Sequence, residues 1–238
     1  MGTYKNNELL IKNSFEFPCS YIEGKLERRL CISIIQPNSN QIVSELTKKG
    51  FRRNYNHMYL PSCRDCNSCI PSRINIKKFV FSKSNKRNIK NNNDLMLIEN
   101  KKYSENRYSL FRKYCEIRHE KGLMKKMTEN EFINFFHKSI NQTKIFDLID
   151  PKGVLYGSIL LDVLNDGYSA VYSFFNPNYK KRGLGKNIIL QTINRLKKEN
   201  SNFLYIGYWI KESENMKYKS SFNNVEYLTT GTWNSKKL

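Results

Sequence analysis

The stretch from Tyr168 to Lys219 constrains the fold of this chain most strongly. It carries a strand pattern over 168–175, a glycine loop at Arg182-Gly183-Leu184-Gly185, a helical pattern over 187–199 and an aromatic strand pattern over 203–210. The last pattern has almost no polar residue, so we expect a central strand. Glycines ahead of a helix let backbone N–H groups approach an anion, which the helix N-terminus also favours. This order of elements predicts a cradle for an activated acyl group, whereas a short glycine pair alone is a weak signal.

The charge of the chain points to a polyanionic partner. Its 238 residues include 41 Lys and Arg against 21 Asp and Glu, for a formal charge of +20. RNA, DNA and an anionic membrane all suit this charge. The alternative is a compositional drift toward lysine and asparagine with no such partner. No apolar run approaches the ~20 residues of a membrane span, and the N-terminal residues lack the apolar core of a secretion signal. We therefore expect a cytoplasmic protein without membrane contact and without disulfides.

Helical and strand patterns alternate along the chain. They predict helices over 41–49, 105–119 and 128–139, and strands over 74–81, 144–149, 154–164, 168–175 and 203–210. Asn40 is the expected cap of the first helix. The polar run 82–93 predicts a loop, a linker or a docking surface. We expect an α+β fold in which a mixed sheet flanked by helices occupies 101–238, preceded by a smaller cysteine-containing region over 1–100.

Three cysteines, Cys63, Cys66 and Cys69, follow one another at a spacing of C-x-x-C-x-x-C. Thiolates at this spacing can share zinc or belong to an iron–sulfur cluster. Such a site needs a further ligand, for which Cys19 is our candidate, with Cys31 and His57 as alternatives. The competing interpretation is three small residues packed in a turn, because a second C-x-x-C pair is missing.

The predicted cradle resembles the fold of GCN5-related N-acetyltransferases, in which the strand before the loop splays away from the strand after the helix. Three function classes fit it. An acetyl-coenzyme A enzyme would hold a pyrophosphate at 183–185, and an aminoacyl-tRNA user would hold the tRNA 3′ end there. A metal-stabilised RNA-binding module without catalysis is the third class. The charge of +20 and the cations within 83–90 favour tRNA.

A series of short motifs sharpens this choice. They are Gly50-Phe51-Arg52-Arg53, the cysteine run from Tyr59 to Arg73, the basic run Ser82–Arg87, Arg118-His119, Ser169-Ala170-Val171-Tyr172, Gly207-Tyr208-Trp209-Ile210 and Met216-x-Tyr218-Lys219. In this order they resemble the bacterial branch of the aminoacyl-tRNA–protein transferases, the leucyltransferases that act on N-terminal Asp or Glu. The resemblance spans about Cys19 to Trp233. Two departures are Ser20, where the family has proline, and Gly183, where serine is common; the second keeps acetyl transfer as an alternative.

The resemblance implies a reaction of two substrates that requires no cofactor. The α-amine of a protein beginning with Asp or Glu attacks the ester that joins leucine to its tRNA, and the new N-terminal leucine marks the protein for degradation. Arginyl transfer within the same superfamily is the nearest alternative. The reaction needs a proton acceptor, a donor to the developing oxyanion and a cation for the acceptor's carboxylate.

Candidate residues can be named for each role. Asp162 is the candidate proton acceptor, and Tyr172 and Tyr208 are candidate hydroxyl donors, each with a structural role as the alternative. Arg73 and Arg118 are the candidates for the acceptor's carboxylate, with internal ion pairs as the alternative. His119 is a second candidate base.

A larger set of residues is expected to hold the aminoacyl-tRNA. It comprises Lys83, Lys86, Arg87, Arg182, Gly183, Gly185, Trp209, Lys217 and Lys219. Trp209 would stack on the terminal adenine, and the cations would contact phosphates. The alternatives are core packing for the tryptophan and a solvated surface for the lysines.

Overall fold

The structure, a computed structural model, describes residues 10–34, 39–118 and 123–235. The strands are β1 (Leu10–Asn13), β2 (Phe17–Pro18), β3 (Leu26–Glu27), β4 (Arg29–Ser33), β5 (Arg52–Asn54), β6 (His57–Pro61), β7 (Ile70–Asn75), β8 (Met96–Glu99), β9 (Thr143–Ile149), β10 (Leu155–Leu164), β11 (Gly167–Phe175), β12 (Phe203–Trp209), β13 (Val225–Thr229) and β14 (Thr232–Asn234). The helices are α1 (Ser39–Lys48), α2 (Lys83–Lys90), α3 (Glu105–Arg118), α4 (Glu129–Phe136), α5 (Leu184–Lys198) and α6 (Glu214–Lys217), with short 3-10 helices η1 (Leu123–Lys126), η2 (Pro177–Arg182) and η3 (Tyr218–Ser221).

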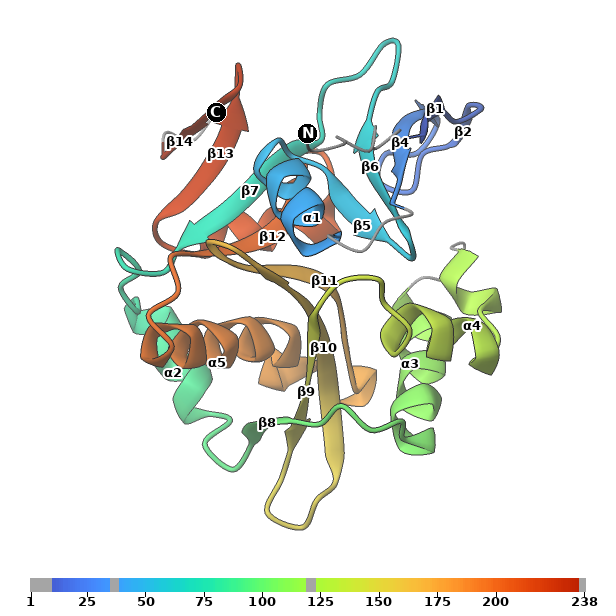
Figure 1. Ribbon diagram of the computed structural model, residues 1–238. Coiled ribbons are helices and arrows are strands. Elements are labelled where there is room, and N and C mark those ends of the chain that lie inside the picture. The colour runs from blue at the N-terminus through green and yellow to red at the C-terminus, as the bar shows by residue number, and fades with distance from the viewer. Residues whose placement is uncertain (1–9, 35–38, 119–122, 236–238) are drawn as a thin grey trace, which may run out of the picture.

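One large mixed sheet organises the molecule. Its order is β14-β13-β7-β12-β11-β10-β9-β8, and within it β9, β10 and β11 form an antiparallel meander. Strands β11 and β12 are parallel neighbours. Parallel strands need a long crossover connection, and α5 with its 15 residues provides it. Helices α5 and α2 lie on one side of the meander, and α3 and α4 lie on the other (Figure 1). The predicted α+β fold with helices flanking a mixed sheet is confirmed, and β12 is central as expected.

Two apolar clusters hold the helices on the sheet. The first lies under α5, where Ile188, Ile189 and Ile193 share a buried face with β7, β10 and β12. The second is aromatic and joins α3 and α4 to β11 through Phe111, Phe132 and neighbouring rings. Burial of side chains of this size is the main stabilising contribution to such layers.

The helix signals account for where α4 begins. Thr128 accepts from the Glu131 N–H at 3.3 Å, and the Glu131 carboxylate accepts from the Thr128 N–H at 2.7 Å. This is a capping box, in which two backbone donors are satisfied reciprocally. By contrast, Asn40 does not cap α1, which starts at Ser39. Its Oδ1 instead accepts from the Gln142 N–H at 2.6 Å, a contact to a segment 102 residues away.

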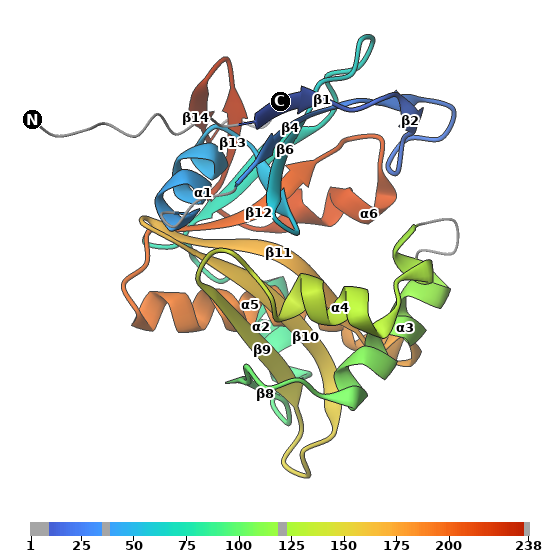
Figure 2. The ribbon, with the colours of Figure 1, turned by 45° about the vertical axis from the view of Figure 1, so that its right-hand side comes forward.

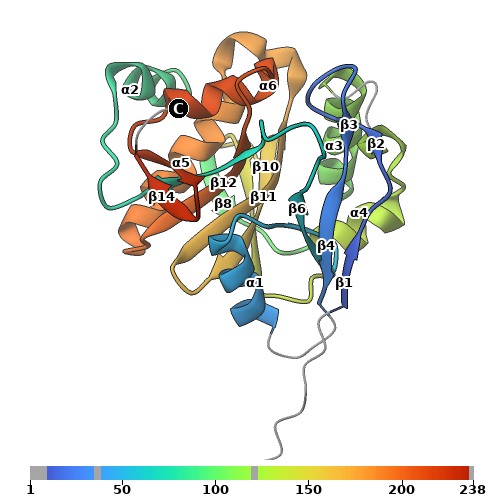
Figure 3. The ribbon, with the colours of Figure 1, turned by 90° about the horizontal axis from the view of Figure 1, so that it is seen from above.

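A smaller sheet lies across one end of the large sheet. Its order is β1-β4-β6-β5, and with α1 it sits over the end of the meander near β12 (Figures 2 and 3). Ile32, Val43 and Met58 of this layer form one cluster with Leu164 and Tyr205 of the large sheet. The region 1–100 also supplies β7 and β8 to the large sheet, so the predicted division at residue 100 does not coincide with a division between sheets.

Three predicted elements differ in the structure. The run 82–93 contains α2 rather than a loop, because Ser82 caps the helix and a polar rather than an apolar face is buried. The strand predicted at 74–81 is β7, which ends at Asn75 where its pairing with β12 ends. Helix α5 starts at Leu184, three residues before the predicted start, because Gly183 already serves as its N-cap.

The remaining boundaries are close to those predicted, with α3 ending at Arg118 and α4 at Phe136. Residue 119, at which the predicted helix ends, lies outside the described ranges. In the described ranges, no helix combines the length and apolarity that crossing a membrane requires.

Candidate active site

The strands β11 and β12 separate after a short parallel pairing. They are paired only from Gly167 to Ser169 against Phe203 to Tyr205. Beyond that point β12 has a register shift toward β7, and Gly207 takes a φ of +78° within it. The splay that the resemblance to acetyltransferases predicts is therefore present. After Ser169, β11 is no longer paired with β12, and its register against β10 shifts between Ala170 and Tyr172, so the carbonyls at this point can bind another group.

That group is Arg52 of β5, which the sequence did not single out. Its Nη2 donates to the carbonyl oxygens of Ala170 at 2.9 Å and Val171 at 3.0 Å. A Cβ on Gly207 would lie 1.4 Å from Arg52 Nη1, so the guanidinium rests directly against the glycine backbone of β12. The motif Gly50-Phe51-Arg52-Arg53 was part of the family resemblance, but nothing in the sequence shows that its first arginine reaches carbonyls 118 and 119 residues away.

The glycine loop lies at the N-terminus of α5, as predicted. Gly183 is left-handed (φ 61°, ψ 44°) and no side chain caps the helix, so the N–H groups of the first turn remain for another acceptor. A Cβ on Gly185 would meet the ring of Phe175 at 2.6 Å. Arg182, which was expected to contact the aminoacyl-tRNA, instead forms an ion pair with Asp94 and donates to Asn92 Oδ1 at 2.9 Å.

Hydrogen bonds from asparagine side chains hold helix α2 beside the glycine loop. Asn88 donates to the Arg182 and Gly183 carbonyls at 3.2 Å each, and Asn92 donates to the Arg182 carbonyl at 2.9 Å. Asn85 is the fully buried residue of α2, although its side-chain amide makes no hydrogen bond to a described residue. This polar attachment leaves the predicted tRNA contacts Lys83, Lys86 and Arg87 exposed. With Lys90, Lys180 and Lys181, which are also exposed, they form a surface that we call the basic ridge.

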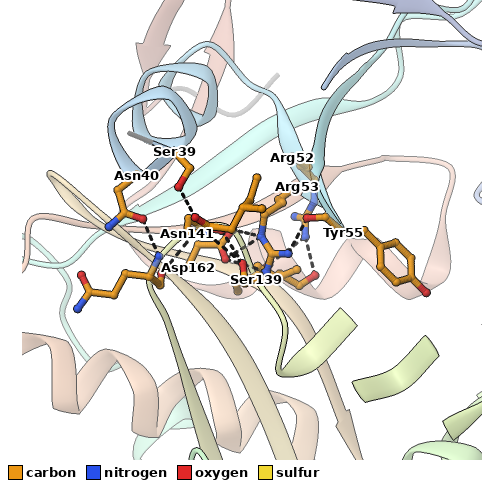
Figure 4. A network of polar contacts seen from close by, with 12 residues as sticks. Ser39, Asn40, Arg52, Arg53, Tyr55, Ser139, Asn141 and Asp162 are labelled. Atoms are coloured by element: carbon orange, nitrogen blue, oxygen red, sulfur yellow. Dashed lines mark hydrogen bonds and ion pairs between the residues drawn. The ribbon is translucent and has the colours of Figure 1, made fainter. Parts of the chain in front are cut away.

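Asp162 lies in a buried ion pair rather than at an open site. Arg53 Nε is 2.9 Å from both of its carboxylate oxygens, and both side chains are 1% exposed. Arg53 also donates to the Tyr55 carbonyl at 3.0 Å. Figure 4 shows this pair joining β5 to β10, next to the contacts of Asn40 and Asn141. The geometry thus matches the structural alternative for Asp162, and we assign it no proton transfer.

The two tyrosines differ in what their hydroxyls meet. Tyr208 is 2% exposed and its hydroxyl lies 3.1 Å from the Gly50 carbonyl and 3.2 Å from the Tyr59 carbonyl. Tyr172 packs edge-on against Phe111, with its hydroxyl 3.8 Å from Cys115 Sγ. Burial raises the pKa of both hydroxyls, so both stay protonated. Tyr208 lies beside Arg52, whereas Tyr172 belongs to the aromatic cluster under α3.

The predicted arginines for the acceptor have different surroundings. Arg73 Nε donates to Glu226 at 2.8 Å, and its guanidinium lies 3.6 Å from the ring centroid of Phe203. It therefore already has a carboxylate, which is the internal ion pair named as its alternative. Arg118 is exposed over the ring of Phe175. His119 lies outside the described ranges.

The residues after β12 divide between surface and interior. Lys217 is half-exposed and pairs with Glu214. Lys219 is 6% exposed, and its Nζ donates to the Tyr208 carbonyl at 2.6 Å, which directs it inward rather than toward a phosphate. Trp209 is also 6% exposed and packs edge-on against Tyr227. Stacking of an adenine on Trp209 would require this packing to open.

Cys69, one of the four predicted metal ligands, lies close enough to the other three for their charges to act on it. Burial and then Glu27, Cys19, Cys63 and Cys66 raise the pKa of the Cys69 thiol to about 12, which keeps it protonated at neutral pH. Hydrogen bonds from Ser68 lower the pKa of Cys66. Among the described residues, however, no three Cys, His, Asp or Glu side chains converge as metal ligands do.

The zinc or iron–sulfur site therefore stays a prediction that metal analysis can test. One equivalent of zinc or iron in the purified protein, lost in Cys66→Ser, would establish it. A metal-free protein whose Cys66→Ser variant unfolds at the same urea concentration would leave the cysteines as packing residues.

The family model described as "Arginine-tRNA-protein transferase, C terminus" matches residues 106–229, and that for the N terminus matches residues 17–87. This chain belongs to that family. It is an aminoacyl-tRNA-dependent protein transferase, and the two matches cover the splayed strands, the glycine loop, the basic ridge in part and the cysteine run.

Curated relatives match the transferase over most of its length. It is 37% identical over 217 residues to the aspartate/glutamate leucyltransferase of Nitrosococcus oceani, which covers 91% of each chain. It is 33% identical over 228 residues to that of Saccharophagus degradans, covering 95% of this chain and 97% of the relative. Among solved structures, L-PGS from Bacillus licheniformis matches with a TM-score of 0.46 and 11% identity over 60% of this chain and 47% of the other.

Proposed function

We propose that this transferase moves leucine from leucyl-tRNA to the α-amine of proteins that begin with Asp or Glu. The observation that carries the proposal is the match to relatives named aspartate/glutamate leucyltransferase over nine-tenths or more of the chain. The geometry supports it, because a half-buried guanidinium lies in the gap between β11 and β12, where a negatively charged acceptor can be held.

The chemistry asks mainly for positioning. The ester of an aminoacyl-tRNA is already activated, so alignment of the amine with the ester carbonyl supplies much of the rate acceleration. The proposal places the tRNA 3′ end at the glycine loop, where the uncapped N-terminus of α5 attracts a phosphate. The leucyl ester then points into the gap between β11 and β12, and the acceptor enters the gap from the side of β5.

The acceptor range tests the proposal. We expect the purified transferase with leucyl-tRNA to add one leucine to peptides that begin with Asp or Glu, as read by mass spectrometry. The same peptides beginning with Asn or Gln are the matched controls, because they have nearly the same shape without the charge. Equal modification of all four peptides, or of none, would contradict the proposal.

The basic ridge is expected to bind the tRNA backbone. Changing Lys83, Lys86 and Arg87 together to alanine should reduce the slope of log K against log salt by about 2 to 3, since each phosphate contact with duplex contributes about 0.9. Filter binding of leucyl-tRNA at several salt concentrations measures this slope.

The control for the ridge removes the same charge elsewhere. Lys102, Lys113 and Lys152 are exposed and lie away from α2 and α5. Their joint change to alanine should leave the slope nearly unaltered. If both triple variants lose the same slope, the transferase attracts tRNA by net charge alone and the docking role of α2 is wrong.

A further inference from the structure

A guanidinium fills the root of the gap between β11 and β12, and it is held on both sides. Arg52 Nη2 donates hydrogen bonds to the carbonyls of Ala170 and Val171. Nη1 lies against the Cα of Gly207, a position open only because that residue is glycine. Nε and Nη1 make no hydrogen bond to any described residue and remain available to a ligand. The side chain is thus fixed in place while part of its donor fork is unused.

The charge of Arg52 has no counter-ion in the described part of the chain. Arg53, Arg73 and Arg107 each pair with a carboxylate, but no described Asp or Glu pairs with Arg52. The buried carboxylate of Glu27, which acts on the nearby Cys69 and Tyr21, is taken by Arg29. A cation withdrawn from water without a partner is costly. An incoming anion would therefore be bound with little competition from the protein itself.

A second basic side chain, that of Lys219, also contacts Tyr208. Lys219 Nζ donates to the Tyr208 carbonyl, and the Arg52 guanidinium lies 5.9 Å from the centroid of the Tyr208 ring. Burial and then the charge of Arg52 lower the pKa of Lys219 well below its ordinary value. No described carboxylate pairs with Lys219 either. An anion bound close to both basic groups would favour their charged forms.

We propose that Arg52 binds the side-chain carboxylate of the acceptor's first residue, with Lys219 as a second basic group near this site. The inference rests on the proposed function and names the residues that read the acceptor. It replaces Arg73, which already has Glu226 as its carboxylate. A neutral Asn or Gln side chain would leave Arg52 without its counter-ion, which gives the site its discrimination.

The burial of the Arg52 and Lys219 side chains favours a side-chain carboxylate over a tRNA phosphate. Arg52 is half-buried and Lys219 is 6% exposed, beside a cluster that contains Tyr59, Tyr208 and Ile210. A phosphodiester carries two bulky ribose substituents, whereas the first side chain of a peptide is narrow and ends in its charge. Exposed cations for phosphates are already present on the basic ridge.

The test compares matched peptides in matched variants. We expect Arg52→Gln to lower kcat/KM for a peptide beginning with Asp about 100-fold, in the range found when one member of a buried charge pair is removed. The value for the peptide beginning with Asn should change little, so the preference of the wild type collapses. Arg112→Gln, which removes an exposed arginine from α3, should leave both values unaltered.

Two further variants keep the test decisive if Arg52→Gln unfolds. Arg52→Lys retains a charge without the fork and should lose part of the preference. Lys219→Met should reduce it as well, because the methionine fills the same space without the amine.

The outcomes separate the inference from the function. Wild type that transfers leucine with a preference for Asp, together with an unchanged preference in Arg52→Gln, would overturn the inference alone. An equal loss for both peptides with weaker leucyl-tRNA binding would show that Arg52 binds phosphate, which also overturns it. A wild type without leucyl transfer would overturn the proposed function.

Discussion

Replacing Arg53 by alanine is expected to lower the free energy of unfolding by about 3–5 kcal/mol. The change leaves the carboxylate of Asp162 buried without its partner, and it removes the donor to the Tyr55 carbonyl at the junction of the two sheets. Urea unfolding followed by tryptophan fluorescence measures the loss. It should appear as an earlier midpoint with an unchanged slope.

Two controls separate burial from charge. Arg112 and Glu116 form an exposed pair on α3, and Arg112→Ala should cost less than about 1 kcal/mol. The double change Arg53→Met with Asp162→Leu removes both charges and should recover most of the stability, since an apolar pair of similar volume replaces them. A loss in Arg53→Ala no larger than in Arg112→Ala would show that the Arg53–Asp162 pair does not join the sheets.

Gly207→Ala is expected to lower kcat/KM for leucyl transfer about 100-fold. The added Cβ would lie 1.4 Å from Arg52 Nη1, so the guanidinium must leave the carbonyls of Ala170 and Val171. A displacement of about 1 Å at a site that works by positioning has an effect of this size. The assay is initial-rate transfer to a peptide beginning with Asp.

Gly153→Ala is the matched control. Gly153 has a φ of +80°, close to the +78° of Gly207, but nothing lies within 4 Å of its added Cβ in the turn between β9 and β10. Both variants carry the backbone cost of about 1–2 kcal/mol for a left-handed alanine. Only Gly207→Ala should lose activity. If the two variants retain equal activity, the close contact between Arg52 and Gly207 is not needed for transfer.

The parts of the fold that the sequence predicts are those held by local patterns. The meander β9–β11, helix α5 and the central strand β12 each carry an apolar periodicity of their own, and all were found close to the predicted residues. The small sheet was missed because its strands are three to five residues long and alternate weakly. Helix α2 was missed because its sequence has no apolar periodicity. Asparagine side chains, rather than an apolar face, bind it to the glycine loop.

The sequence predicted where in the fold the candidate site lies, but not which side chains contact one another there. The splay was predicted from the resemblance to the acetyltransferase fold, and the glycine loop from the order of elements along the chain. The partners of Arg73 and Asp162 do not, because Glu226 and Arg53 lie 153 and 109 residues away. For both residues the structural alternative matches the geometry. Arg52 escaped notice for the same reason, since its binding groups are backbone carbonyls, which have no signature in sequence.

The identity of the acyl donor tests most directly whether this transferase uses leucyl-tRNA. The purified transferase would be incubated with a peptide beginning with Asp and, in parallel, with leucyl-tRNA, arginyl-tRNA or acetyl-coenzyme A, and the peptide mass would be read. The account predicts a gain of one leucine with the first donor, abolished by ribonuclease, and no gain with the other two. Addition of arginine, or of an acetyl group in the presence of ribonuclease, would contradict it.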